Sequence, residues 1–297
     1  MTSPIWAIAP RSAPSISESD NKEATSVEFI LLYLAKCVAA VKGAIYSELE
    51  QANIVDISHE VSPFNIQECA YILKNSYTHF PKGSIHIVGV DGEKTPDNPH
   101  IVVLVDGHYF ISANTGVVHL ICTSITPDKV VSISLPNEKA SSFPTLDTFV
   151  KVACHIARGG SLDVIGKPFS ALKELIDFKP QISEGEKIIS GSVIYIDNYG
   201  NVVTNISQTL FNTYQKGRTF KIRARHTNIT QIHKKYSDFI KFDIDKDKRS
   251  GDGELLAIFN QAGYIEIAIY KSNLQTSGGA STLLGLDYLD SITLEFD

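Results

Sequence analysis

The sequence predicts a two-domain protein, in which an α/β domain with a mostly parallel sheet precedes a small antiparallel β-barrel. Up to about residue 180, strand and helix patterns alternate, as they do in domains built on a parallel sheet. From Ile188 onward the helical patterns nearly vanish and short strands separated by turns replace them, which is typical of a barrel. The change from alternating strands and helices to strands alone falls between Asp177 and Glu186. We therefore expect an α/β domain at 27–180 and a barrel domain at 186–297.

Composition narrows the class of protein. A chain of 297 residues with 43% hydrophobic content can bury one large core or two medium ones. The formal net charge of −6 argues against a general nucleic-acid binder. The four cysteines are widely separated, with no CxxC pair and no histidines at metal spacing, so we expect neither a metal site nor a disulfide framework. The longest apolar run, Phe29–Val41, is too short to span a bilayer, and no signal peptide is apparent. These features predict a cytoplasmic protein with no membrane or nucleic-acid partner.

The N-terminal region divides into two segments. Residues 1–26 are rich in Ser, Pro and Ala and show no apolar period, so we expect them to be disordered. Val27–Glu50 reads as one helix, with Phe29, Leu32 and Ala35 among the residues on the side that can face the sheet.

A strand, a helix and a second strand follow. Asn53–Ile57 and Ser84–Val90 are β-branched runs of the kind buried in a parallel sheet. The helix between them starts after Pro63 and Asn65 and ends before Pro81. We expect a βαβ unit with a right-handed crossover. Ligands bind beyond the carboxyl ends of such strands, and these ends are marked by Asp56-Ile57-Ser58-His59 and by Asp91.

The rest of the α/β domain has clear turn signals. Asp106-Gly107 predicts a hairpin that joins strands Ile101–Val105 and Tyr109–Ser112. Gly116–Cys122 fits a short helix or a strand, and Val130–Leu135 another strand. Thr145 is a suitable N-cap for a helix that ends at Arg158-Gly159-Gly160.

About five strands are predicted in the second domain. The turn Asp197-Asn198-Tyr199-Gly200-Asn201 indicates a hairpin. The strands are Ser192–Ile196, Val202–Ile206, Thr219–Arg225, Leu255–Phe259 and Tyr264–Ile269.

Several motifs, in order along the chain, resemble the S-adenosylmethionine hydroxide adenosyltransferase family, which includes the fluorinases and chlorinases. They read DISHEVSPFNIQECAYIL, FPKGSIHIVGVD, GSVIYIDNYGNVVTNIS and GELLAIFNQAGYIEIAI. The resemblance implies attack on the ribose C5′ of S-adenosylmethionine, most simply by water, giving adenosine and methionine. It implies no cofactor, and a homotrimer in which the ligand lies between the α/β domain of one subunit and the barrel of a neighbour.

The same resemblance implies three catalytic positions. Asp91 matches the aspartate that heads the family's Asp-Pro-Gly-Val-Gly-Thr-x-Arg loop, but Asn98 stands where the arginine is expected. Pro144 replaces the histidine of Thr-Phe-His-Gly-Arg-Asp, and Thr145 matches a position that helps hold the halide in halogenases. Arginine favours an ionised water and histidine can take its proton, whereas asparagine does neither well. The alternative is a non-catalytic protein that binds adenosyl ligands. Asp91 could also simply cap its loop, and Thr145 its helix.

Four further positions match ligand contacts of the family. Three of them have a second interpretation from local structure: a hydrophobic staple into the core for Phe64, a turn residue with positive φ for Asn201, and a barrel-core side chain for Tyr236. The predicted substrate-binding residues are Phe64, Tyr199, Asn201 and Tyr236.

The start of the chain departs from the family pattern. Family members open with a buried strand that ends in a Thr-Asp-Phe-Gly-like turn, whose aspartate holds the ribose hydroxyls. Because Val27–Glu50 reads as a helix, no such strand is predicted before Val38. We therefore expect Met1–Cys37 to come from a faulty gene model, and the chain as written to bind adenosyl ligands weakly.

Overall fold

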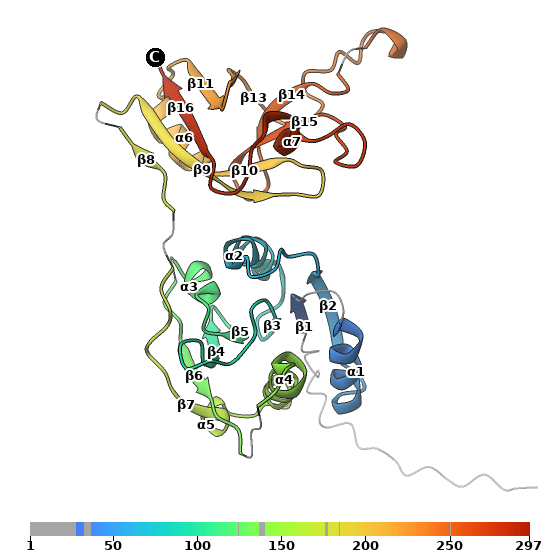
Figure 1. Cartoon of the computed structure of the whole chain (residues 1–297), viewed down its shortest axis with the longest axis vertical. Helices are drawn as coiled ribbons and strands as arrows, with labels where there is room; N and C mark the ends of the chain where they lie inside the picture. Colours follow the sequence, from blue (N-terminus) through green and yellow to red (C-terminus); the bar gives the residue numbers. More distant parts are fainter. Residues whose placement is uncertain are drawn as a thin grey trace, which may run out of the picture.

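The computed structural model describes residues 28–32, 37–123, 125–136, 140–175, 178–183, 185–249 and 251–297. An α/β domain and a barrel domain lie one above the other along the long axis of the molecule (Figure 1). The first contains a seven-stranded sheet in which most strands run in one direction, and the second a nearly closed sheet of mostly antiparallel strands. The predicted fold class is therefore confirmed. The segment expected to be disordered, 1–26, lies outside the described residues.

The N-terminal region differs from the sequence-based expectation. Glu28–Leu32 forms strand β1, and helix α1 covers only Val38–Glu48. β1 lies between two parallel neighbours, β2 (Asn53–Ser58) and β3 (Ile85–Val88). Periodicity cannot separate a short buried strand from a helix. The gap between β2 and β3 favours the strand, because the backbone N–H and C=O groups that face this gap would otherwise have no hydrogen-bond partners. The prediction that no strand precedes Val38 is therefore wrong. The expected origin of Met1–Cys37 in a faulty gene model stays a prediction, because 1–27 and 33–36 lie outside the described residues.

The order of the first sheet is β2-β1-β3-β5-β4-β6-β7. β2 and β3 are thus parallel members of one sheet, as expected of a βαβ unit, but β1 separates them. Only β4 and β7 run against the other five strands, so the first residue of β4 reaches the edge at which β1, β2, β3 and β5 end. The remaining strands are β4 (His100–Val105), β5 (His108–Ala113), β6 (Lys129–Ile133) and β7 (Gly166–Pro168).

Helices cover both faces of this sheet. α1 and α4 enclose one apolar core, which includes Ile45, Ile87 and Val152. α2 and α3 enclose the other, which includes Leu73, Val103 and Phe110. The helices are α2 (Ile66–Lys74), η2 (Tyr77–His79), α3 (Val117–Ile121), the π-helical turn η3 (Thr145–Phe149), α4 (Val150–Ala157) and α5 (Leu162–Ile165).

Several local predictions are confirmed. The Asn65 side chain caps α2 by accepting a hydrogen bond from the Glu68 amide at 3.1 Å. Asp106-Gly107 joins β4 and β5 in a hairpin that pairs Val105 with His108. The ambiguous stretch Gly116–Cys122 is helical.

The second domain contains more strands than predicted. The order is β12-β11-β16-β9-β10-β15-β14-β13, and β8 pairs with β9. The core includes Ile189, Val202 and Ile267. Its strands are β8 (Gln181–Ile182), β9 (Ile188–Ile196), β10 (Val202–Ser207), β11 (Phe220–Ala224), β12 (Thr227–Ile229), β13 (Ile232–His233), β14 (Leu255–Phe259), β15 (Tyr264–Ile269) and β16 (Ser291–Phe296). Its helical segments are α6 (Gln208–Gln215), η4 (Lys246–Lys248) and α7 (Ala280–Leu284).

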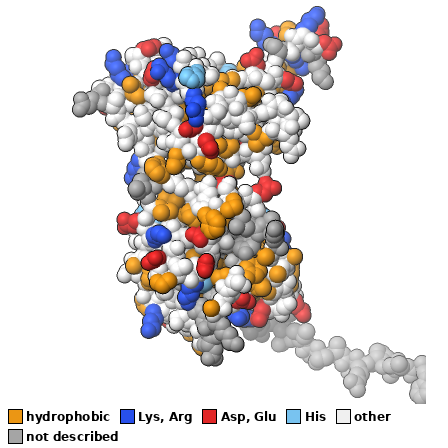
Figure 2. All heavy atoms as spheres, viewed as in Figure 1, with side chains coloured by type: hydrophobic (Ala, Val, Ile, Leu, Met, Phe, Trp, Pro, Cys, Tyr) orange, Lys and Arg blue, Asp and Glu red, His pale blue; other side chains and the backbone are white. Residues whose placement is uncertain are grey.

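The two domains meet along α2. The Tyr71 ring stacks on Tyr195 of β9 at 4.8 Å between centroids, and its hydroxyl lies 3.2 Å from Asn260 Nδ2. Figure 2 shows hydrophobic side chains gathered at the level where the domains meet. Within the described part of the chain, no helix is both long and apolar enough to cross a membrane.

Candidate active site at the strand edge

Asp91 lies just beyond β3, at the edge where the parallel strands end. Its backbone is left-handed, with φ 49°, a conformation that aspartate tolerates better than most residues. Among the residues that the structure describes, none donates a hydrogen bond to its carboxylate. The loop-capping interpretation therefore finds no support there, and the carboxylate is available to a ligand.

Thr145 lies next to this turn. A side chain begun at Gly92 would come 3.6 Å from Thr145 Oγ1, so the Asp91-Gly92 turn rests on the start of η3. Thr145 is 2% exposed. Its predicted capping role is wrong: Pro144 occupies the N-cap position, and no side chain caps this helix. The φ of proline already suits a helix start, so the helix begins one residue earlier than predicted.

Asn98 lies on the same loop and contacts the chain that leads to the second domain. Its Oδ1 accepts a hydrogen bond from Lys173 Nζ at 3.0 Å. Asn114, 4% exposed, holds this connecting segment with both ends of its amide: Nδ2 donates to the Ala171 carbonyl and Oδ1 accepts from the Lys173 amide, each at 3.0 Å. An ammonium group thus lies against Asn98.

Phe64 occupies the same edge, between β2 and α2. It is 74% exposed and its φ is 62°. The staple interpretation fails, because the ring does not enter the core. A bulky side chain in this region is a steric outlier, and such strain is concentrated at functional sites. We therefore retain Phe64 as a candidate ligand contact.

Tyr199 and Asn201 lie in the turn between β9 and β10. Asp197 organises this turn: Oδ1 accepts from the Tyr199 and Asn201 amides, and Oδ2 from Asn201 Nδ2, each at 2.9 Å. The positive φ in the turn belongs to Gly200 and not to Asn201, so the turn-residue interpretation of Asn201 is wrong. The turn also reaches the first domain, since Asn198 Nδ2 donates to Glu60 Oε2 at 2.6 Å.

Tyr236 lies elsewhere within one chain. It lines a pocket of about 510 Å³ between the domains, with Lys74 and His79 near the end of α2 opposite to Phe64. Its hydroxyl donates to Glu266 Oε1 at 2.5 Å. Burial raises the pKa of the Tyr236 phenol and, although hydrogen bonds from Tyr236 and Asn260 oppose it, that of the Glu266 carboxyl. The ring is 41% exposed, so the barrel-core interpretation fails. The structure does not bring Tyr236 to the Asp91 edge.

Sequence reasoning missed three residues of this region. Asp197 appeared only as part of a turn, and Lys173 gave no signal. His100 directly precedes the strand predicted at Ile101–Val105 and gave no signal of a function. Only the reversed direction of β4 brings it to the site. Asp56 and His59, also at this edge, bind each other at 3.0 Å, and Asp56 binds Lys42 at 2.6 Å. In the part of the chain that the structure describes, no group of three metal-ligating side chains comes together.

The structure defines a two-domain protein with a candidate site where the parallel strands of the first sheet end. Profiles of the SAM hydroxide adenosyltransferase N-terminal and C-terminal domains match residues 33–166 and 191–293. The chain therefore belongs to the SAM hydroxide adenosyltransferase family.

Named relatives agree with this assignment. The chain is 30% identical to the (R)-S-adenosyl-L-methionine hydrolase of Methanocaldococcus jannaschii over 264 residues, which cover 86% of this chain and 90% of the relative. It is 22% identical over 203 residues to a fluorinase of Actinoplanes sp. (strain N902-109), covering 58% and 67% of the two chains.

Two crystal structures share the fold. An uncharacterised conserved protein from Thermotoga maritima matches with a TM-score of 0.74 and 25% identity, covering 90% of this chain and 99% of that one. A conserved hypothetical protein from Thermus thermophilus matches with a TM-score of 0.63 and 16% identity, covering 91% and 100%.

Proposed function

We propose that this protein cleaves S-adenosylmethionine at the ribose C5′ with water, giving adenosine and methionine. The observation that carries the proposal is the 30% identity to an S-adenosylmethionine hydrolase, which extends over 86% of the chain and so through both domains. The strand-edge residues support it. Asp91, Asn98 and Thr145 lie within the matched N-terminal domain, and the carboxylate of Asp91 faces no described donor.

The reaction requires little covalent chemistry from the protein itself. The water oxygen forms a bond to C5′ while the C5′–S bond breaks, and the bonding electrons neutralise the sulfonium, so methionine leaves uncharged at sulfur. The released proton passes to Asp91 and then to solvent. Because the leaving group is already activated, the proposal needs no cofactor: binding, exclusion of bulk water and in-line aim of the nucleophile suffice.

The test is to incubate the purified protein with each sulfonium epimer of S-adenosylmethionine and to follow adenosine by chromatography. We include both epimers because the relative is named for the (R) form. Parallel reactions with chloride or fluoride would reveal halogenated products. Adenosine above the uncatalysed background supports the proposal. Tight binding by calorimetry without any product would instead make the protein a non-catalytic adenosyl-ligand binder.

We further propose that the site is shared between subunits of a homotrimer. Phe64 and Tyr199, one on each domain, are 74% and 66% exposed in a single chain, and a ligand or a neighbouring subunit would bury them. Asn201→Ala should weaken binding without unfolding the barrel. If the site is shared, co-expressed Asp91→Asn and Asn201→Ala chains should regain activity that neither variant has alone. In a mixed oligomer, some interfaces pair the native Asp91 of one subunit with the native Asn201 of its neighbour. Mixed oligomers as inactive as the parents, or a monomeric mass for the active protein, would contradict the shared site.

We expect the Phe64 side chain to favour substrate binding at a cost in stability. In Phe64→Gly the relief of left-handed strain, about 1–2 kcal/mol, offsets the entropic cost of glycine, about 0.5–1 kcal/mol, so the melting temperature should not fall. The loss of a ring that the ligand would bury should raise KM by about 10–100-fold, since such burial contributes about 1.5–3 kcal/mol.

The matched control is Leu289→Gly. Leu289 is likewise left-handed and exposed, with φ 66° and 53% exposure, but it lies in the barrel before β16. It should give the same change in melting temperature and an unchanged KM. An unchanged KM in Phe64→Gly would remove this residue from the binding site.

A further inference from the structure

His100 is the first residue of β4, and the reversed direction of that strand places it at the edge where Asp91 lies. The side chain is 1% exposed. Its ring stands edge-on to Phe149, with 4.8 Å between the centroids and 78° between the planes. The imidazole is therefore held rigidly, between the sheet and the start of the η3–α4 helix.

The ring makes a directional contact with the Asp91-Gly92 turn. His100 Nε2 lies 3.0 Å from the Gly92 carbonyl oxygen. A carbonyl oxygen only accepts hydrogen bonds, so Nε2 carries the proton and donates. This bond holds the turn from the sheet side, while Thr145 Oγ1 lies close to Gly92 on the helix side. The Asp91-Gly92 turn is thus flanked by two buried polar side chains.

His100 also forms part of the wall of a pocket beside this turn. The pocket has a volume of about 290 Å³ and is lined in part by Lys94, Ser141, Pro144 and Thr148. Since a water molecule occupies about 30 Å³ in the liquid, several waters fit. The lining carries the Glu93 carboxylate, an ammonium group and two hydroxyls, which suit water better than an apolar ligand.

We propose that His100 is the positioning residue of Asp91: its bond to the Gly92 carbonyl aims the Asp91 carboxylate at the water that attacks C5′. The inference rests on the proposed function and adds a residue that does not itself touch the substrate. Its contribution is geometric, because a displacement of about 1 Å at the reacting groups can cost about 100-fold in rate.

Two substitutions separate positioning from packing. His100→Phe keeps the ring and its contact with Phe149 but removes the donor. His100→Gln loses the ring and cannot take up a proton, but its amide can still donate to the Gly92 carbonyl. We expect His100→Phe to lower kcat by about 10–100-fold with KM unchanged. His100→Gln should keep most of the wild-type kcat and the wild-type dependence of kcat on pH.

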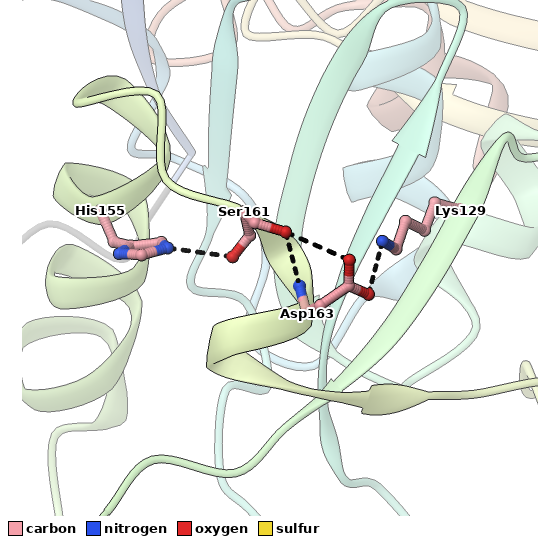
Figure 3. Close-up of polar contacts among 4 residues, drawn as sticks. All are labelled: Lys129, His155, Ser161 and Asp163. Carbon is pink, nitrogen blue, oxygen red and sulfur yellow. Dashed lines mark hydrogen bonds and ion pairs between the residues drawn. The ribbon is translucent and has the colours of Figure 1, made fainter.

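His155 provides a matched control. Its Nε2 makes the same kind of contact, 3.0 Å from the Ser161 carbonyl, but in the last turn of α4, beside Asp163 and Lys129 (Figure 3). It lies ten residues along the helix from Thr145, about 15 Å at 1.5 Å per residue. His155→Phe should lower the melting temperature by less, because this bond is exposed, and should leave kcat unchanged.

The outcomes are distinguishable. If the wild type forms adenosine and His100→Phe is equally active, the inference fails and the proposed function stands. If His100→Gln is as impaired as His100→Phe, or if its pH profile loses a limb, the imidazole transfers a proton itself and the positioning role is wrong. A wild type that forms no adenosine would remove the proposed function, and this inference with it.

Discussion

Asp91→Asn should lower kcat by about 10²–10⁴-fold, the usual contribution of a group that accepts a proton in the transition state. Asparagine keeps the size of the side chain and tolerates the left-handed backbone, with φ 49°, so the turn should keep its shape. Substrate affinity by calorimetry should change little, because the substitution removes a proton acceptor and not a binding surface. Adenosine formation under saturating substrate is the measurement.

Asp106→Asn is the control for this substitution. Asp106 also precedes a glycine and has nearly the same backbone, with φ 48°, but it lies in the β4–β5 hairpin at the opposite edge of the sheet. The variant loses an exposed ion pair with Lys82, 2.6 Å long, which is worth about 0–1 kcal/mol. Its kcat should equal that of the wild type. Equal activities of Asp91→Asn and wild type would show that Asp91 is not the base.

The second large effect concerns acid stability. His86 is fully buried in β3, stacked on Phe110 at 4.6 Å and 3.3 Å from the His108 ring nitrogen. Burial, reinforced by His108, lowers the pKa of His86 to about 3 from an ordinary value of 6.5. Between these two pKa values, His86 therefore binds a proton in the unfolded chain but not in the folded chain. Stability should be complete above pH 6.5 and should fall as pH drops towards 3, by up to roughly 4–5 kcal/mol from this residue.

His86→Phe should flatten that fall, because phenylalanine can keep the stacking contact and cannot titrate. At pH 7 the variant should be less stable, by about 1–3 kcal/mol for the unpaired His108 nitrogen, but its disadvantage should shrink or reverse by pH 4. Urea unfolding across this pH range is the measurement. Ile87→Val, in the same strand, is the control and should lose a similar amount at every pH. Parallel curves for His86→Phe and wild type would contradict the assignment.

The sequence could predict those parts of the protein that depend on local pattern. Asn65 before an amphipathic run indicated the start of α2, and Asp106-Gly107 the β4–β5 hairpin, because caps and tight turns are decided by a few adjacent residues. Asp91 was found for the same reason, at the end of a buried strand. Residues 28–32 were misread because five apolar residues fit a helix as well as a strand, and only the gap between β2 and β3 distinguishes them.

The site itself depends on long-range geometry that no local pattern contains. His100 reaches the Asp91 turn only because β4 runs against its neighbours, and Lys173 reaches Asn98 only because the buried Asn114 amide folds the connecting segment back. Thr145 lies beside the Asp91-Gly92 turn, but its predicted capping role was wrong, since Pro144 took the capping position. Tyr236 lies in another pocket within one chain, and its role in a site shared between subunits stays a prediction.

Because β1 lies between two strands that follow it in the sequence, it cannot complete its pairing until both have been synthesised. Residues 28–32 are made before either strand that flanks them, and Phe29, Ile30 and Leu31 are all buried when folding is complete. Until Val88 has left the ribosome, one side of this strand can bond only with water or with another chain, as at any open sheet edge. The nascent protein therefore carries an exposed apolar segment while more than fifty further residues are made. Factors that shield such segments would act on this chain early, before its ligand site exists.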